Sequence, residues 1–247
     1  MSRLRRHAVP VVVCLGIVDA VAIVNGTTVS DERFAAEYPW AVALEYPGSD
    51  QVCTATLIHP SWVLTAAHCT SSDVRVKLAH ASRTRAVAAA VAAVHVHPRY
   101  DATTGAFDIG LIELAKPAIR ATLAVAQPAE IERLLQSGAP ALIAGWGRRS
   151  TSSGYSDRLI ASDLRLDRLE REESRFAYLD TASGPCGGDS GGPLLLAASD
   201  GTLRLVGIAS RVAGDPCAAG GGIGIYADVG AALPFLRAHV PGLSGSL

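Results

Sequence analysis

The sequence predicts an all-β fold of the sandwich or barrel type. Its apolar residues fall mostly in short runs, and Gly, Pro, Ser and Asp residues separate one run from the next. Short strands joined by frequent turns are typical of such folds. The chain has 247 residues, a length that all-β barrels reach as one domain. It shows no heptad pattern, tandem repeat or low-complexity linker that would indicate another organisation.

The apolar runs define the predicted strands in order along the chain. They cover residues 40–46, 55–58, 62–65, 74–78, 109–114, 141–144, 194–197 and 203–209. Residues 84–97 fit two interpretations, because their alanine content favours a helix whereas small residues also pack closely in a strand. Two segments are predicted helices. Residues 164–175 are dense in alternating charges, and residues 231–239 tolerate Pro234 in a first turn.

The composition excludes several classes of protein. Hydrophobic residues make up 49% of the chain and the mean hydropathy is +0.27, which argues against a disordered protein. Charged residues make up 18%, and the formal net charge is −1. Nucleic-acid-binding domains usually carry a basic excess. We therefore expect no nucleic-acid partner.

The N-terminal segment, residues 1–22, has the features of a secretory signal peptide. A basic start is followed by an apolar run over residues 8–18 and by the small-x-small triplet Ala20-Val21-Ala22. The apolar run is shorter than the ~20 residues that span a bilayer. The alternative is a buried N-terminal strand or helix. The signal peptide predicts a secreted protein, with no membrane segment after cleavage.

The cysteines indicate disulfides. Cys14 lies in the predicted signal peptide, and Val13 before it argues against a lipoprotein anchor, which requires a small residue there. The remaining cysteines are Cys53, Cys69, Cys186 and Cys217. An even number in an exported chain predicts two disulfides, and the count alone leaves three pairings open. Zinc binding is disfavoured because there is no Cys-x-x-Cys pair.

Three segments carry residues suited to nucleophilic catalysis. They are Leu64-Thr65-Ala66-Ala67-His68-Cys69, Phe107-Asp108-Ile109-Gly110-Leu111 and Gly187-Gly188-Asp189-Ser190-Gly191-Gly192-Pro193. Taken singly, a lone histidine, an aspartate before an apolar run and a glycine-rich turn each have a structural explanation. The third segment is the most specific, since its serine stands among glycines and directly after an aspartate. The chain order His, Asp, Ser is that of the chymotrypsin branch of triad enzymes.

Through these segments the chain resembles the trypsin/chymotrypsin family of serine peptidases over essentially all of residues 23–247. The resemblance also rests on Ile23-Val24-Asn25-Gly26, Tyr38-Pro39-Trp40, Trp62-Val63-Leu64, His97-Pro98, Gly145-Trp146-Gly147 and Ile225-Tyr226. It implies two packed six-stranded antiparallel barrels with a boundary near residues 120–138, and a short C-terminal helix. It also implies a monomer that cleaves proteins or peptides without a cofactor and that protein inhibitors can block. Independently of the resemblance, the richness in Ala and Arg is typical of a GC-rich bacterial source.

By the same resemblance, His68, Asp108 and Ser190 form the catalytic triad. A serine hydroxyl needs a base at neutral pH, and an imidazole, held in one tautomer by a carboxylate, supplies it. The backbone N–H groups of Gly188 and Ser190 match the oxyanion hole, which stabilises the charge that develops on the attacked carbonyl. Ser210 matches the residue that supports the aspartate.

The resemblance further pairs Asp189 with the α-amino group of a mature N-terminus at Ile23. A buried carboxylate without a cation is costly, so the pair forms only when Ile23 is a free terminus. The predicted signal cleavage after Ala22 would create this terminus, so that export and activation are one cut. The resemblance also favours the disulfides Cys53–Cys69 and Cys186–Cys217.

The substrate pocket matches Gly184, Pro185, Val212 and Gly224. Trypsin-like enzymes with basic specificity carry a carboxylate at the position of Gly184, which is neutral here. Val212 narrows the pocket, and Arg211 replaces an aromatic residue and makes the rim positive. We expect a small or medium apolar residue before the cleaved bond. The second interpretation is a preference for Arg or Lys, for which Asp215 supplies the charge.

Three other functions compete with this one. A catalytically inactive trypsin-like binding protein is disfavoured because all three triad residues are present. An esterase or lipase would use the Gly-x-Ser-x-Gly segment around Ser190, but the order Ser, Asp, His leaves His68 unexplained. A metal site on His95 and His97, two residues apart, is less expected than a structural role. We therefore expect no metal.

Overall fold

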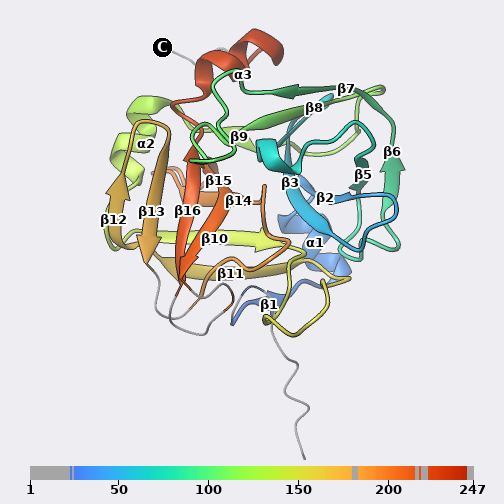
Figure 1. Cartoon of the computed structure of the whole chain (residues 1–247), viewed down its shortest axis with the longest axis horizontal. Helices are drawn as coiled ribbons and strands as arrows, with labels where there is room; N and C mark the ends of the chain where they lie inside the picture. The colour runs from blue at the N-terminus through green and yellow to red at the C-terminus, as the bar shows by residue number, and fades with distance from the viewer. Residues whose placement is uncertain (1–22, 24, 180–182, 215–216, 218–221, 244–247) are drawn as a thin grey trace, which may run out of the picture.

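The fold consists of two curled β-sheets packed against each other, with a short helix at the C-terminal end (Figure 1). The computed structural model describes residues 23, 25–179, 183–214, 217 and 222–243. The predicted signal peptide, Val24 and Asp215 lie outside these residues. The two half-barrels and the C-terminal helix confirm the predicted fold class.

The first sheet is built from the N-terminal half of the chain and is antiparallel throughout. Its order is β6-β5-β2-β3-β4-β8-β7. The strands are β2 (Ala41–Glu45), β3 (Val52–His59), β4 (Trp62–Thr65), β5 (Arg75–Leu78), β6 (Val87–Ala89), β7 (Val91–Val96) and β8 (Gly110–Leu114). Residues 84–97, which fitted a helix or a strand, form β6 and β7, because both segments complete ladders with β5 and β8.

The second sheet follows the path β1-β11-β10-β14-β15-β16-β13-β12, and β9 pairs with β15 in parallel. Its strands are β1 (Thr27–Thr28), β9 (Ala124–Val125), β10 (Pro140–Gly145), β11 (Ile160–Arg165), β12 (Asp167–Arg171), β13 (Arg175–Leu179), β14 (Pro193–Ala197), β15 (Leu203–Gly214) and β16 (Gly222–Asp228). Within the described residues the two sheets hold seven and nine strands instead of six each. Short strands at the margins, such as β1 and β6, account for the difference.

The helix predicted over residues 164–175 is wrong. This stretch runs through the end of β11 into β12 and the turn that leads to β13. Phe176 and Tyr178 alternate with more exposed residues on β13 and are buried, as expected of a strand that pairs with β16. The Arg171 side chain bonds Asp228 at 3.1 Å across the sheet. Tertiary pairing therefore overrides the helix propensity of a charged sequence.

The helices are short. α3 (Leu233–His239) confirms the helix predicted over residues 231–239, and its proline lies in the first turn. Two further helices were not predicted from the sequence, because seven residues are too few for a clear helical period. They are α1 (Asp31–Glu37), which Ser30 caps, and α2 (Pro128–Leu134). No helix in the described part of the chain is long and apolar enough to cross a membrane.

The two sheets meet where β3 contacts β10 and β14. Thr54 of β3 makes the polar contacts of this junction. Its backbone N–H donates to the Ser190 carbonyl oxygen at 2.8 Å, and its hydroxyl donates to the Gly188 carbonyl oxygen at 3.2 Å. The Trp146 N–H donates to the same hydroxyl at 3.2 Å. Thr54 thus fixes the loop around Ser190 against the first sheet.

Candidate active site

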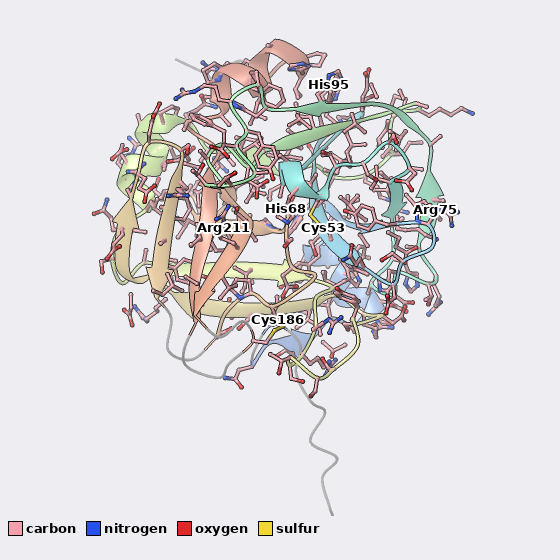
Figure 2. The ribbon with its side chains drawn as sticks, viewed as in Figure 1. Cys53, His68, Arg75, His95, Cys186 and Arg211 are labelled. Carbon is pink, nitrogen blue, oxygen red and sulfur yellow. A yellow bond between two sulfur atoms is a disulfide. The ribbon has the colours of Figure 1, made fainter. Side chains whose placement is uncertain are left out.

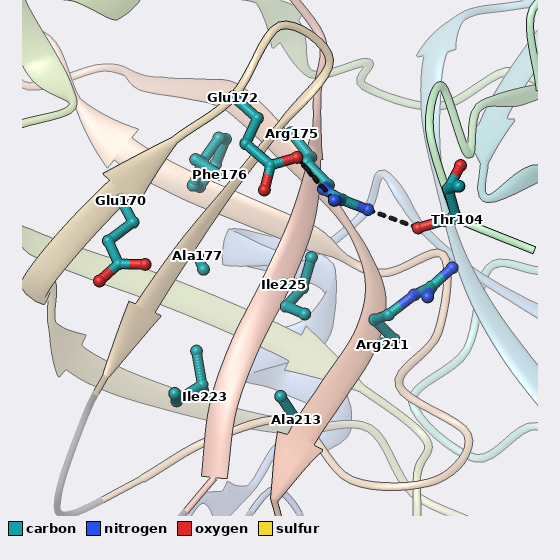
Figure 3. A pocket seen from close by; sticks show the side chains of 10 residues that line it. All are labelled: Thr104, Glu170, Glu172, Arg175, Phe176, Ala177, Arg211, Ala213, Ile223 and Ile225. Atoms are coloured by element: carbon teal, nitrogen blue, oxygen red, sulfur yellow. Dashed lines mark hydrogen bonds and ion pairs between the residues drawn. The ribbon is translucent and has the colours of Figure 1, made fainter.

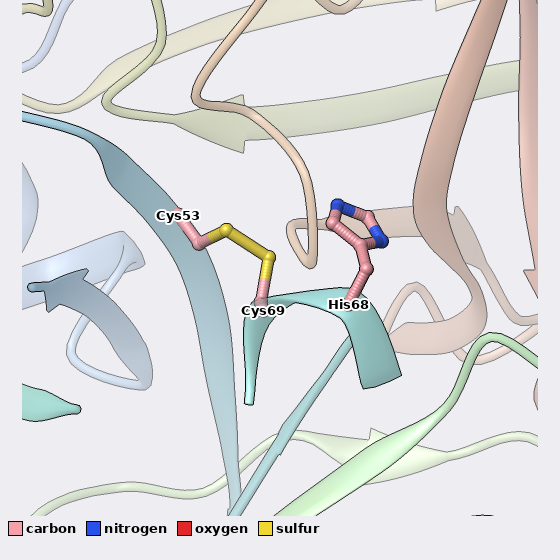
Figure 4. Close-up of side chains that lie close together, drawn as sticks. All are labelled: Cys53, His68 and Cys69. Atoms are coloured by element: carbon pink, nitrogen blue, oxygen red, sulfur yellow. A yellow bond between two sulfur atoms is a disulfide. The ribbon is translucent and has the colours of Figure 1, made fainter. Parts of the chain in front are cut away.

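His68 lies at the junction of the two half-barrels, in the single 3₁₀ turn η1 (Ala67–Cys69) that follows β4 (Figure 2). The Cys53–Cys69 disulfide ties this turn to β3, one residue beyond His68 (Figure 4). The turn brings a ring nitrogen and the backbone nitrogen of His68 into contact with the carboxylate of Asp108. Nδ1 lies 2.7 Å from Asp108 Oδ2, and the backbone N–H donates to Asp108 Oδ1 at 3.0 Å.

Asp108 sits directly before β8 and is 2% exposed. The Ser210 hydroxyl donates to Asp108 Oδ2 at 2.6 Å, in addition to the two contacts with His68. Burial alone would raise the pKa of Asp108. The hydrogen bonds from His68 and Ser210 and the attraction of the imidazole outweigh it, so the pKa lies below its ordinary value. The carboxylate is therefore held ionised and in a fixed orientation.

Phe107 turns the chain into Asp108. Its φ of 49° lies in the left-handed region, which is strained for a bulky residue. Packing compensates for the strain, since the ring stacks on His97 with centroids 4.6 Å apart and the Arg99 guanidinium lies over it at 4.1 Å. His97 therefore has the structural role that the sequence favoured, and it supports the turn that aims Asp108.

The Ser190 loop requires its glycines. A Cβ at Gly191, where φ is +78°, would overlap the Thr65 hydroxyl and the Thr54 carbonyl oxygen. A Cβ at Gly188, where φ is +99°, would lie 2.7 Å from the Tyr155 ring. The loop can thus lie flat against the first sheet. Ser190, Gly188 and His68 line one cavity of about 350 Å³.

The amides expected to form the oxyanion hole have no internal acceptor. Among the described residues, neither the Gly188 N–H nor the Ser190 N–H donates a hydrogen bond to another backbone or side-chain group. The neighbouring N–H groups of Asp189 and Gly191 are both bonded, to the carbonyl oxygens of Cys186 and Ala209. Two free donors in a bonded loop can donate hydrogen bonds to an anionic oxygen of a ligand.

Asp189 is fully enclosed beneath this loop. Its carboxylate accepts from the N–H groups of Gly147 and Cys186, both at 2.9 Å. Burial raises its pKa to about 7, although these two donors oppose the rise. A Cβ at Gly147 would lie 2.5 Å from the carboxylate, and one at Gly145 would overlap it. The sequence Gly145-Trp146-Gly147 is therefore the wall against which Asp189 packs.

Ile23 is also buried, with an exposed fraction of 0%. Asp189 has no cationic partner among the residues that the structure describes. Both residues of the expected activation pair are therefore buried. The Asp189 carboxylate has no positive charge beside it among the described residues.

A second, smaller cavity of about 120 Å³ adjoins Ser190. Pro185 and Val212, both expected in the substrate pocket, line it together with Ser210 and Arg211. Gly184 and Gly224 do not line it. Gly224 instead pairs with Val212 and packs against the ring of Tyr178, where a Cβ would lie 3.3 Å away.

Both expected disulfides, Cys53–Cys69 and Cys186–Cys217, are present. Cys53, Cys69 and His68 come close enough for their ligand atoms to hold a metal ion, but both sulfurs belong to the disulfide and offer no thiolate (Figure 4). Two residues that build the site were not predicted from the sequence. Thr54 holds the Ser190 loop against the first sheet, and Tyr155 lines the cavity of His68.

Comparison with known proteins identifies the family of the chain. A family model described as Trypsin matches residues 23–236. Rat chymotrypsin-C is 34% identical over 203 residues, which cover 73% of this chain and 76% of the relative. A trypsin from Saccharopolyspora erythraea is 32% identical over 216 residues, covering 79% and 89%. Mouse vitamin K-dependent protein C is 29% identical over 88% of this chain, which spans about half (52%) of that relative. The chain therefore belongs to the trypsin family of serine-type endopeptidases, whose members act on proteins and peptides.

Proposed function

We propose that this protein is a secreted serine endopeptidase that cleaves peptide bonds through an acyl-enzyme formed on Ser190. The observation that carries the proposal is the buried Asp108 carboxylate, which holds His68 Nδ1 at 2.7 Å in a cavity that Ser190 also lines. In this arrangement Nε2 of His68 is the nitrogen left to take the Ser190 proton. The hydroxyl oxygen then attacks the substrate carbonyl, and the protonated imidazole gives its proton to the leaving amine.

The free N–H groups of Gly188 and Ser190 support the second part of the mechanism. Attack by Ser190 turns the carbonyl oxygen into an oxyanion, which two aligned donors stabilise more strongly than they stabilise the substrate. Loss of one such donor typically costs about 2.7–4 kcal/mol in the transition state.

The cavity of about 120 Å³ beside Ser190 supports a preference for a small or medium apolar residue before the cleaved bond. Pro185 and Val212 restrict its width, and its described lining contains no carboxylate. A Lys or Arg side chain would therefore lose its hydration there without gaining a counter-charge.

We also propose that one cut after Ala22 both releases the protein and activates it. The buried, uncompensated carboxylate of Asp189 supports this, since a free α-amino group at Ile23 would supply the missing cation. The pair would hold the loop of Gly188 in the conformation that the oxyanion requires. N-terminal sequencing of the secreted protein should give Ile23 as its first residue, and any other start contradicts the single-cut proposal.

A panel of peptides that differ only in the residue before the cleaved bond tests the activity and its specificity together. The proposal predicts cleavage after Ala, Val or Leu by the wild type and none by the S190A variant. Cleavage after Arg alone would overturn the specificity but not the mechanism. Equal hydrolysis by the wild type and S190A would overturn the mechanism.

A further inference from the structure

Arg211, which Figure 2 labels near His68, lines two cavities. One is the cavity of about 120 Å³ beside Ser190, and the other, of about 370 Å³, extends over β13, β15 and β16 (Figure 3). The floor of the larger cavity is apolar and includes Phe176, Ala213 and Ile225. A ligand that fills the first cavity and continues into the second must pass Arg211.

The strand that carries Arg211 offers a route for an extended peptide. β14 pairs with β15 only as far as Ile208, and the Gly191–Gly192 segment bonds Ala209. From there to Gly214, β15 pairs with β16 on one side, and no described strand pairs with its other edge. An extended peptide adds to such a free edge through main-chain hydrogen bonds. The edge begins next to Ser190, so the peptide residues before the cleaved bond would lie along it.

The guanidinium of Arg211 is a charge without a partner. Among the described residues it makes no ion pair and no side-chain hydrogen bond. Arg175, in the same cavity, is different, because Glu172 holds it at 2.6 Å and the Thr104 carbonyl oxygen accepts another of its N–H groups (Figure 3). Arg175 is therefore neutralised locally, whereas Arg211 offers its full charge to a ligand.

The guanidinium of Arg211 lies against the Gly105 backbone, since a Cβ built at Gly105 would lie 2.5 Å from Arg211 Cζ and would overlap its terminal nitrogen. Gly105 has a φ of +74°, a conformation that favours glycine. The Arg211 side chain is exposed, so its planar fork is open to a carboxylate, which it can bind through two parallel hydrogen bonds.

We propose that Arg211 selects substrates with Asp or Glu among the three residues that immediately precede the residue held beside Ser190. The proposal rests on the proposed function of that cleft. Glu170, which makes no ion pair among the described residues, lies across the larger cavity from Arg211 (Figure 3). The preference for acidic residues therefore ends at Glu170, whose negative charge repels them. An acidic residue farther from the cleaved bond does not increase the cleavage rate.

Cleavage-site profiling tests this proposal. The test does not depend on which residue the enzyme prefers directly before the cleaved bond. The activated wild type, R211Q and R85Q each digest one peptide library, and the cleaved sites are aligned. R85Q is the matched control, because it removes one positive charge from an exposed ion pair with Asp31 outside both cavities. We expect enrichment of Asp and Glu before the cleaved bond with the wild type and R85Q, and its loss with R211Q.

Matched peptides then give the magnitude. At the position of strongest enrichment, we expect kcat/KM for Asp to exceed that for Asn on the order of tenfold, as for one charge-assisted hydrogen bond. The Asp/Asn ratio should fall with added salt and stay above one in R211K. In R211E the preference should reverse, so that a peptide with Lys at this position is cleaved faster than one with Gln. Equal rates for Asp and Asn with an active wild type overturn the inference alone. If the wild type cleaves no peptide, the proposed function fails and the inference fails with it.

Discussion

Asp108 and Asp189 are two buried carboxylates whose surroundings shift their pKa values in opposite directions. Asp108 accepts hydrogen bonds from His68 and Ser210 and has a lowered pKa. Among the described residues, Asp189 accepts hydrogen bonds from two backbone N–H groups, and its pKa is raised to about 7. Burial raises the pKa of both groups, and at Asp108 the hydrogen bonds from His68 and Ser210 and the attraction of the imidazole outweigh it. The comparison shows one site already assembled and one that still requires a cation.

The largest effect expected is the loss of Ser190. The S190A variant should lose about 10⁶-fold in kcat, because the covalent route disappears while the fold remains. Rates on the best peptide and a thermal melt measure the two properties. A variant that melts like the wild type and keeps more than a hundredth of its activity would show that Ser190 is not the nucleophile.

The assembled site is tested by D108N. The substitution keeps the shape of the side chain but removes its charge, so His68 loses the partner that fixes its tautomer, and kcat should fall about 10⁴-fold. D200N is the control, because Asp200 caps an exposed turn between β14 and β15 and lines neither cavity beside Ser190. If D108N and D200N have the same kcat, Asp108 has no part in catalysis.

The Asp189 site, which still requires a cation, is tested by a form of the protein that retains Ala22 before Ile23. Without the α-amino group beside Asp189, the loop of Gly188 lacks its support, and kcat should be lower by about 10²–10³-fold, the effect of one lost oxyanion donor. Fluorophosphonate labelling rates of the extended and trimmed forms measure this. Equal rates would remove the reason to link the cut to activation.

The smallest effect concerns stability. In the extended form, the folded pKa of Asp189 is about 7 and its ordinary value is 3.8. Its contribution to stability is therefore fully present below pH 3.8 and is lost as the pH rises toward 7, because the ionised form is disfavoured in the folded state. Extended S190A should melt at lower temperature across this range, and extended S190A/D189N should not share the decline. Parallel curves for the two would contradict the raised pKa.

The sequence predicted the elements whose apolar runs are long and regular, such as the strands around Leu64 and Leu194. It failed for residues 164–175, where the pairing of β11 with β10 and of β12 with β13 decides the conformation and local charge does not. The role of Thr54 was not predicted either, because it depends on a contact with the Ser190 loop. Gly188 in that loop is 134 residues away from Thr54 in the sequence. Motif spacing identified the triad candidates, whereas the contrast between Asp108 and Asp189 required the packing around each carboxylate.

The intact mass of the secreted protein, measured before and after treatment with a fluorophosphonate probe, tests the central claim most directly. The account predicts the mass of residues 23–247 with two disulfides, and the addition of one probe group, on Ser190. A correctly trimmed protein that takes up no probe would contradict it, because the assembled Asp108 site and a completed Asp189 site would then still not produce a nucleophile.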